Sequence, residues 1–327
     1  YQDLAPVVIP PPTAARLYLN GEPWGIYMLK VRVNADFIEE ETGHSDIDLI
    51  KNLEDISAGS DQHWRETLAF FAAANFAQEA DLTEAEERVD VQWMAEYALI
   101  NGWASNHDWP FNNSYVYREQ GGAVPWTWIP WDTDACWGSD SGKPFEYDGI
   151  SLMHDIEPLD DLSDGSPAYR TQIARTWARM RNDMAAPDNL HSLVDMRAAE
   201  LRDDIAFETD RWGSSPEAWE LNIDRMHSYV DERDDIFWRQ VAQGFAPHSG
   251  GWLSVEIDGE GAVAVEELNV ADGWTGRFFG DMPLQLVATP AEGWRFEQWS
   301  GAVDASDSTT TMSIDGDTAL VATFVEE

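Results

Sequence analysis

The chain has 327 residues, enough for two domains, and its 43% hydrophobic fraction argues against global disorder. Its 20 Lys and Arg stand against 61 Asp and Glu, and the formal net charge of −41 argues against nucleic acid and anionic membranes as partners, because phosphate binding needs cationic side chains. No run of about 18 apolar residues occurs, so no membrane insertion is expected. The single cysteine, Cys136, excludes an internal disulfide framework.

The acidic residues are spread along the whole chain rather than gathered in a tail. One interpretation is a solvated, halophilic surface, since salt screens the repulsion among its charges. The other is a set of divalent-cation sites. The sequence starts at Tyr1 without a Met or a basic segment. We therefore expect a processed or truncated form of a secreted or cell-surface protein.

The first predicted elements form a β-hairpin. After a proline-rich lead-in at 9–12, residues 16–21 alternate and end in Asn-Gly, which predicts a tight turn into a second strand at 24–33. A short helix is expected at 34–40 and a further strand at 48–51.

Helices are predicted over 61–77 and 90–104, where apolar side chains keep helical spacing. The second helix leads into residues 101–138, which hold six tryptophans. Among them lie the acids Asp108, Asp132 and Asp134 and the amides Asn106, Asn112 and Asn113. Buried carboxylates are costly unless they hold a metal, transfer a proton or fix a loop. Two strands, 113–118 and 126–130, are predicted within this stretch.

Residues 139–168 are predicted to form a loop rich in acids. Its carboxylates could hold a structural Ca²⁺, although their spacing does not match an EF-hand loop, and a solvated acidic loop is the alternative. The acids concerned are Asp155, Glu157, Asp160, Asp161 and Asp164.

The last third of the chain changes from helices to strands. Helices are expected at 168–184, 187–212 and 216–244, the last capped by Ser215. A linker at 247–251 then precedes a small all-β module at 252–327. Its predicted strands are Leu253–Ile257, Ala262–Val265, Leu284–Ala288, Met312–Ile314 and Ala319–Phe324.

The candidate chemistry lies in the tryptophan-rich stretch. Asp108 and Asn113 have the D-x₄-N spacing with which a protein kinase places an aspartate at the acceptor hydroxyl and an asparagine at a metal ion. Asp132 and Asp134 follow a strand-like segment, where a metal-binding aspartate would lie in such a site. We predict that Asp108, Asn113 and Asp132 converge in one metal-binding cleft.

Three sequence blocks resemble the CotH family, the secreted kinases of the spore-coat-protein-H type. They are L-Y-L-N-G-E-P-W-G-I-Y, N-H-D-W-P-F-N-N-S-Y-V-Y-R and W-I-P-W-D-T-D-A-C-W-G, within a resemblance over residues 15–245. The resemblance implies an α+β fold, with an atypical protein-kinase-like domain made of a β-hairpin and a helical lobe. It also implies transfer of the ATP γ-phosphate to Ser or Thr of extracellular proteins, with Mg²⁺ or Mn²⁺.

The family's functional residues carry over by position. Asp108 resembles the catalytic aspartate, and Asn113 resembles the metal-binding asparagine of the catalytic loop. Asp132 resembles the metal-binding aspartate after the strand, with Asp134 as a second ligand.

The chain departs from the family pattern in two places. Family members carry basic and glycine-containing segments upstream of the hairpin that are thought to cover the nucleotide, and this sequence begins near the hairpin. Family members also commonly have a Glu near the position of Val31, which Lys30 and Arg32 flank here. A kinase needs a cation at the nucleotide phosphates, and Lys30 or Lys51 is the candidate.

Residues 252–327 resemble the bacterial repeat modules of secreted, cell-wall or adhesive proteins, through D-G-x-G and A-x-P-x-x-G-W-x-F-x-x-W-S-G. The resemblance implies contact with a cell wall or an extracellular matrix. The predicted organisation is a CotH kinase-like domain at 1–246, a linker at 247–251 and a small all-β domain at 252–327.

Two other functions stay open. A non-catalytic scaffold or adhesion protein would combine a degenerate kinase-like domain with the β-module. A glycan hydrolase would use Asp108 with Asp132 or Asp134 as paired carboxylates, which lie about 5–9.5 Å apart in glycosidases.

Overall fold

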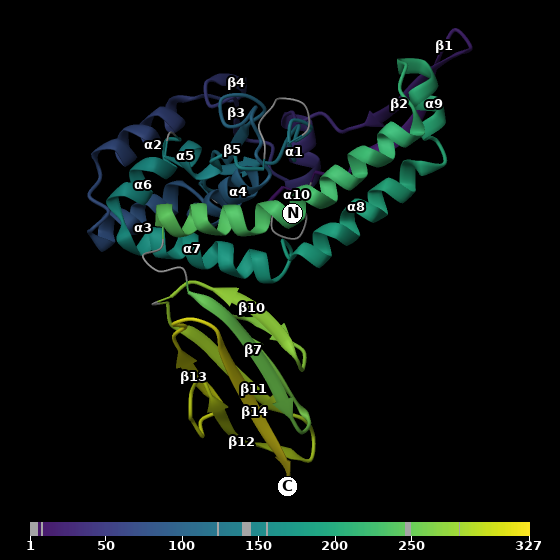
Figure 1. Ribbon diagram of the computed structural model, residues 1–327. Helices are drawn as coiled ribbons and strands as arrows, with labels where there is room; N and C mark the ends of the chain where they lie inside the picture. The colour runs from purple at the N-terminus through teal and green to yellow at the C-terminus, as the bar shows by residue number, and fades with distance from the viewer. Residues whose placement is uncertain are drawn as a thin grey trace. The chain divides into compact units, whose positions relative to one another are not determined.

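The computed structural model describes residues 6–7, 9–122, 124–138, 145–154, 156–245, 250–280 and 282–327. The chain forms two compact units, each built from two separate segments. Unit 1 comprises Tyr1–Pro167 and Leu190–Phe237, and unit 2 comprises Ala168–Asn189 and Trp238–Glu327. The predicted α+β class is confirmed by helices and sheets in the N-terminal region and an all-β C-terminal module (Figure 1). The predicted domain bounds stay a prediction, and residues 247–249 of the predicted linker lie outside the described residues.

The Asn-Gly signal forms the expected hairpin. Strand β1 (Thr13–Leu19) pairs antiparallel with β2 (Glu22–Leu29). Asn20 and Gly21 have φ of 52° and 84°, and this turn requires positive values at both positions. The second strand ends at Leu29 rather than at residue 33. The hairpin lies beside helix α9 (Ile205–Trp212), whose Glu208 accepts a hydrogen bond from the Ile26 N–H at 2.6 Å.

Unit 1 contains a four-stranded antiparallel sheet in the order β4-β3-β5-β6. Helix α1 (Ala35–Thr42) is capped by Asn34, which accepts from the Phe37 N–H at 2.9 Å. Buried side chains of α1 and the sheet, among them Ile38 and Leu49, form one apolar core. The strands are β3 (Ile47–Lys51), β4 (Asp55–Ala58), β5 (Tyr115–Glu119) and β6 (Thr127–Ile129).

Helices surround this sheet, and two of them replace part of the predicted acidic loop. Asp148 caps the first by accepting from the N–H groups of Ile150 and Ser151, and Leu159 and Leu162 of the second are buried. Burial and capping therefore order a segment whose composition predicted a loop. These helices are α2 (Gln62–Ala73), α3 (Glu79–Arg88), α4 (Val91–Trp103), α5 (Gly149–Met153) and α6 (Leu159–Gly165).

The predicted helix 187–212 is broken into α8 (Pro187–Arg202) and α9. At the break, the Asp204 N–H bonds to the Leu201 carbonyl and its carboxylate pairs with Arg16 of the hairpin. Helix α10 (Pro216–Phe245) begins as expected, with Ser215 accepting from the Ala218 N–H at 3.2 Å. No helix of the described segments is long and apolar enough to cross a membrane.

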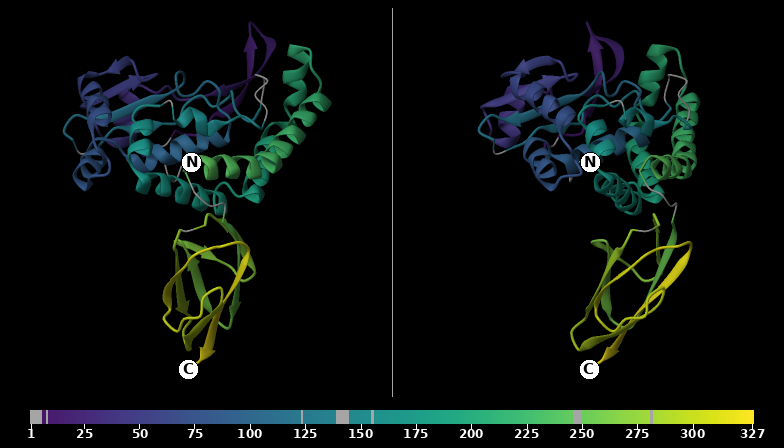
Figure 2. Two further views of the ribbon diagram at one scale, coloured as in Figure 1. Left: turned by 60° about the vertical axis from the view of Figure 1, so that its left-hand side comes forward. Right: turned by 90° about the vertical axis from the view of Figure 1, so that its left-hand side faces the viewer.

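Unit 2 combines the β-module with helix α7 (Pro167–Asn182) and the end of α10. Two four-stranded sheets, β10-β7-β14-β12 and β13-β11-β8-β9, form two layers (Figure 2). Alternate side chains along β7 and β14 are buried, which gives the module its core. The strands are β7 (Gly251–Asp258), β8 (Gly261–Val265), β9 (Leu268–Val270), β10 (Trp274–Phe278), β11 (Leu284–Pro290), β12 (Trp294–Gly301), β13 (Thr309–Met312) and β14 (Thr318–Glu326).

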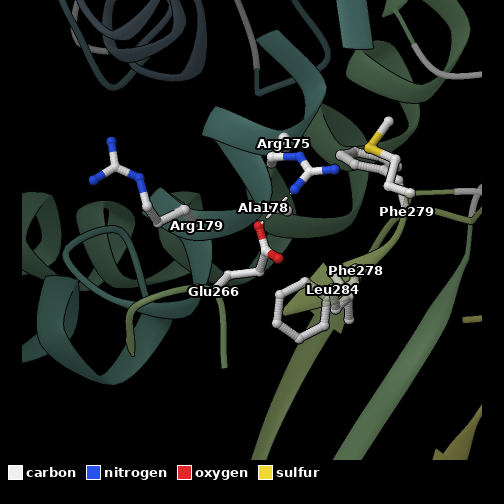
Figure 3. Close-up of a pocket in the computed structure, with 8 residues that line it drawn as sticks. Arg175, Ala178, Arg179, Glu266, Phe278, Phe279 and Leu284 are labelled. Carbon is white, nitrogen blue, oxygen red and sulfur yellow. Dashed lines mark hydrogen bonds and ion pairs between the residues drawn. The ribbon is translucent and has the colours of Figure 1, made fainter. Parts of the chain in front are cut away.

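Helix α7 joins the β-module through polar and apolar contacts. The Asn182 amide exchanges two 2.8 Å hydrogen bonds with the backbone of Arg277. Arg175 pairs with Glu266 at 2.9 Å beside an apolar crevice that includes Phe278 (Figure 3). None of the predicted site residues lines this crevice.

Candidate active site

A chain of hydrogen bonds through the side chains of Asn101 and Asn106, the amide ladder, holds the loop that follows α4. Asn101 donates to the Tyr97 carbonyl at 2.8 Å, and Asn106 donates to the Asn101 side-chain oxygen at 2.8 Å. The Asn106 side-chain oxygen accepts from the Asp108 N–H at 3.3 Å. Both asparagines are buried, so these bonds satisfy groups that would otherwise be costly. The amide ladder therefore links the Asp108 backbone to the C-terminal part of α4.

Asn113 brings the two predicted aspartates together. Its side-chain Nδ2 lies 3.3 Å from Asp108 Oδ2 and 3.5 Å from the Asp132 carbonyl oxygen. The Asn112 N–H bonds to the Asp108 carbonyl at 2.9 Å and closes the loop between them. Residues from both sides of the β5–β6 hairpin therefore meet at one amide, and all three side chains are half-buried.

Two of these residues have left-handed backbone conformations. Asn113 has φ of 55° and Asp132 has φ of 49°. Asn and Asp tolerate this region better than other side chains with a Cβ, and such conformations gather at functional sites when the surrounding structure holds them.

Basic side chains flank two aromatic rings next to Asp132. Lys30 donates to Asp132 Oδ1 at 2.7 Å and its Nζ lies 5.9 Å from the centre of the Trp131 ring. Trp131 meets Tyr115 edge to face at 6.1 Å, and Lys51 Nζ lies 5.9 Å from the Tyr115 ring centre. Burial raises the pKa of Tyr115, and nearby Arg32 opposes that shift. Three cations thus gather on a chain with a large excess of acids.

Asp134 is exposed at the edge of this group. Burial raises the pKa of the Cys136 thiol to about 12, and the negative charges of Asp134 and Asp108 add to the shift. Both carboxylates therefore act on the same buried sulfur. Burial therefore favours the protonated thiol at neutral pH, and the thiolate is the nucleophilic form.

Helix α10 contacts the C-terminal end of α4, from which the candidate site loop begins. Arg233 is fully buried and donates to the carbonyls of Trp103, Gly102, Phe145 and Tyr147 at 2.5–2.9 Å. Tyr229 donates to the Trp103 carbonyl at 2.6 Å. Sequence motifs do not indicate this support, because a lone Arg in an amphipathic helix gives no sequence signal.

The predicted calcium stretch forms a different group from the one expected. His154 Nδ1 lies 3.9 Å from carboxylate oxygens of both Asp160 and Asp164, and the three side chains could hold a metal ion. Burial, followed by neighbouring carboxylates, raises the pKa of Asp161. Asp155 lies outside the described residues. The imidazole adds a nitrogen donor, whereas calcium sites are built from oxygens.

The donors at Asp108, Asn113, Asp132 and Asp134 suit a hard divalent cation. They are carboxylates and an amide, and Mg²⁺ and Mn²⁺ prefer oxygen ligands. Rotation of the Asn113 amide exchanges its nitrogen and oxygen, which would place Oδ1 where Nδ2 now faces Asp108. By donor type these residues fit a metal ion, whereas the described His, Cys, Asp and Glu side chains that already place three ligand atoms within 4.8 Å of one another are His154, Asp160 and Asp164.

The family comparison places the chain in a class of kinase-like proteins. A family model described as CotH kinase protein matches residues 8–237, which is more than half of the chain. The chain belongs to this family. A second model, the divergent InlB B-repeat domain, matches residues 254–327. A search of curated proteins gave no match.

Proposed function

We propose that this chain transfers the γ-phosphate of ATP to Ser or Thr side chains of extracellular proteins, with Mg²⁺ or Mn²⁺. The observation that carries the proposal is the position of the Asn113 amide, 3.3 Å from the Asp108 carboxylate and 3.5 Å from the Asp132 backbone carbonyl, with Lys30 donating to the Asp132 carboxylate.

Each residue has a role in this proposal. Asp108 accepts a hydrogen bond from the acceptor hydroxyl and orients it toward the phosphate. Asn113, Asp132 and Asp134 hold the metal ion, which supplies positive charge to the phosphate oxygens. Lys30 donates to Asp132 Oδ1, and in this proposal the other carboxylate oxygen, Oδ2, binds the metal. The amide ladder keeps Asp108 in place, since small displacements of a catalytic group cost large factors in rate.

The cations next to Asp132 support an anionic ligand. Lys30, Arg32 and Lys51 surround the Trp131 and Tyr115 rings. Where the family commonly has a Glu, Val31 packs against the apolar core, so Asp132 supplies the acid that positions Lys30. A neutral glycan would not need these cations, which favours phosphoryl transfer over glycan hydrolysis.

The test is incorporation of labelled γ-phosphate from ATP into an extracellular protein mixture, with Mg²⁺ or Mn²⁺. We expect Asp108→Asn and Asp132→Asn to reduce incorporation by at least about 100-fold, since each removes a charge used in the transition state. Asp55→Asn, at an exposed acid on β4, serves as the matched control and should leave incorporation unchanged.

Equal incorporation by all of these chains would contradict the assigned roles. Absence of incorporation by a longer chain that carries the upstream family segments would favour the scaffold function. Release of reducing sugar from a glycan, lost in Asp108→Asn, would favour the hydrolase.

The rest of the proposal concerns place and partners. A secreted or cell-surface location in a saline medium accounts for the charge of −41, because salt screens the repulsion among the acids. The module matched at 254–327 would contact a cell wall or an extracellular matrix. A structural divalent metal ion at His154, Asp160 and Asp164 is the remaining part of this proposal, and the imidazole there favours a transition metal over the Ca²⁺ expected from the sequence.

A further inference from the structure

The pattern H-S-x-V-D occurs twice in the chain, as His191–Asp195 on α8 and His227–Asp231 on α10. The two helices run antiparallel in unit 1, as the Arg202–Glu220 pair at 2.8 Å also indicates (Figure 1). The valines of both motifs are buried, which aligns the two helices in one register. The histidines and aspartates consequently face each other across the pair.

The contacts are reciprocal. His191 Nε2 lies 2.9 Å from Asp231 Oδ1, and His227 Nε2 lies 3.1 Å from Asp195 Oδ1. Each histidine therefore bonds to the aspartate of the other motif. The two Nδ1 atoms face each other at 2.6 Å, with ring planes within 21° of one another.

The point between the two Nδ1 atoms is where a proton or a metal ion could bind. A carboxylate only accepts hydrogen bonds, so each Nε2 donates to its aspartate and each Nδ1 can turn a lone pair toward the other ring. The 2.6 Å between the two Nδ1 atoms is a hydrogen-bond distance, and one proton shared between them joins the rings when no metal is bound. A metal cation would displace that proton and bind the same two nitrogens.

We propose that His191 and His227 bind one divalent transition-metal ion of the Zn²⁺ and Ni²⁺ class through their Nδ1 atoms. Asp195 and Asp231 orient the rings through Nε2, which is the usual arrangement behind metal-binding histidines. Nitrogen ligands at about 2.0–2.1 Å from tetrahedral zinc lie about 3.4 Å from each other, so the Nδ1 atoms separate by less than about 1 Å on binding. Both imidazoles are 27% exposed, which leaves room for water as the other ligands.

The experiment is titration of the full chain, freed of metal by chelation, with ZnCl₂ and with NiCl₂ in a calorimeter. We expect His191→Gln and His227→Gln each to remove one equivalent of binding. Asp195→Asn and Asp231→Asn should weaken that equivalent by about 10- to 100-fold. His44→Gln is the matched control and should bind as the unsubstituted chain does, and His154→Gln identifies any separate binding at the other His-containing group.

Ring ¹⁵N resonances of the unsubstituted chain give a second readout that does not depend on the folding of a variant. Zinc should shift Nδ1 of both histidines at one equivalent. Identical titrations of the His191→Gln, His227→Gln and unsubstituted chains, or ring resonances that respond to protons but not to zinc, would overturn the proposal.

Discussion

Replacement of Arg233 by Met should destabilise unit 1 by about 3–4 kcal/mol. The change removes four hydrogen bonds, but three of the acceptors keep another donor. Trp103 keeps the Tyr229 hydroxyl, and the Gly102 and Tyr147 carbonyls keep backbone N–H groups. We take about 1 kcal/mol for each of these three and about 2 kcal/mol for the Phe145 carbonyl. Removing the buried guanidinium also removes its desolvation cost, which offsets about 1–2 kcal/mol of the lost stability.

The assay is urea unfolding followed by near-ultraviolet circular dichroism. Trp103 and Trp137 both contact Tyr229, so this signal reports on the region next to Arg233. Arg225→Met, at an exposed arginine of the same helix, should change the free energy of unfolding by less than about 0.5 kcal/mol. A loss below about 1 kcal/mol for Arg233→Met would refute the reasoning, because it would mean that the freed carbonyls find other donors.

Two further changes test the hairpin and the core. Gly25→Ala should lower the free energy of opening the hairpin by at least about 1 kcal/mol. The φ of Gly25 is +105°, and an added Cβ would lie 2.5 Å from Glu208 and 2.7 Å from Trp212. Unchanged amide exchange rates in β2 would contradict this prediction. Burial, then Arg118 and Arg88, lowers the pKa of His63, whose neutral ring accepts the Trp126 indole N–H at 3.0 Å. As the pH falls, the unfolded chain protonates His63 first, because its pKa there is about 6.5 and the folded value is lower. The Tm should therefore fall between pH 7 and pH 5, and His63→Gln should reduce this dependence of Tm on pH. The same pH dependence of Tm in both chains would contradict the prediction.

Local signals in the sequence predicted the elements that depend on local chemistry. The Asn20-Gly21 turn and the Ser215 cap came out as expected, since both are set within a few residues. Helices α5 and α6 could not be predicted from composition, because tertiary burial stabilises these short acidic segments. The break between α8 and α9 likewise includes a pairing between Asp204 and Arg16, 188 residues apart.

The candidate site shows the same division. The spacing of Asp108 and Asn113 placed them on one loop, and the structure brings Asp132 to them. Arg233 donates to the Trp103 carbonyl at the end of α4 from 130 residues away, and no pattern in the neighbouring sequence indicates this contact. Sequence motifs thus indicate which side chains could act, whereas the side chains that position them are recognised only in the folded chain.

The bonds between Asn182 and Arg277 have a consequence for synthesis on the ribosome. These partners are 95 residues apart, and chains grow by about 5–20 residues per second, so α7 waits on the order of ten seconds for its strand. During that interval the apolar partners that complete unit 2 do not yet exist. The nascent helix α7 therefore exposes its module-facing side chains during that interval, and a chaperone or fast translation through the β-module would shorten or cover that exposure.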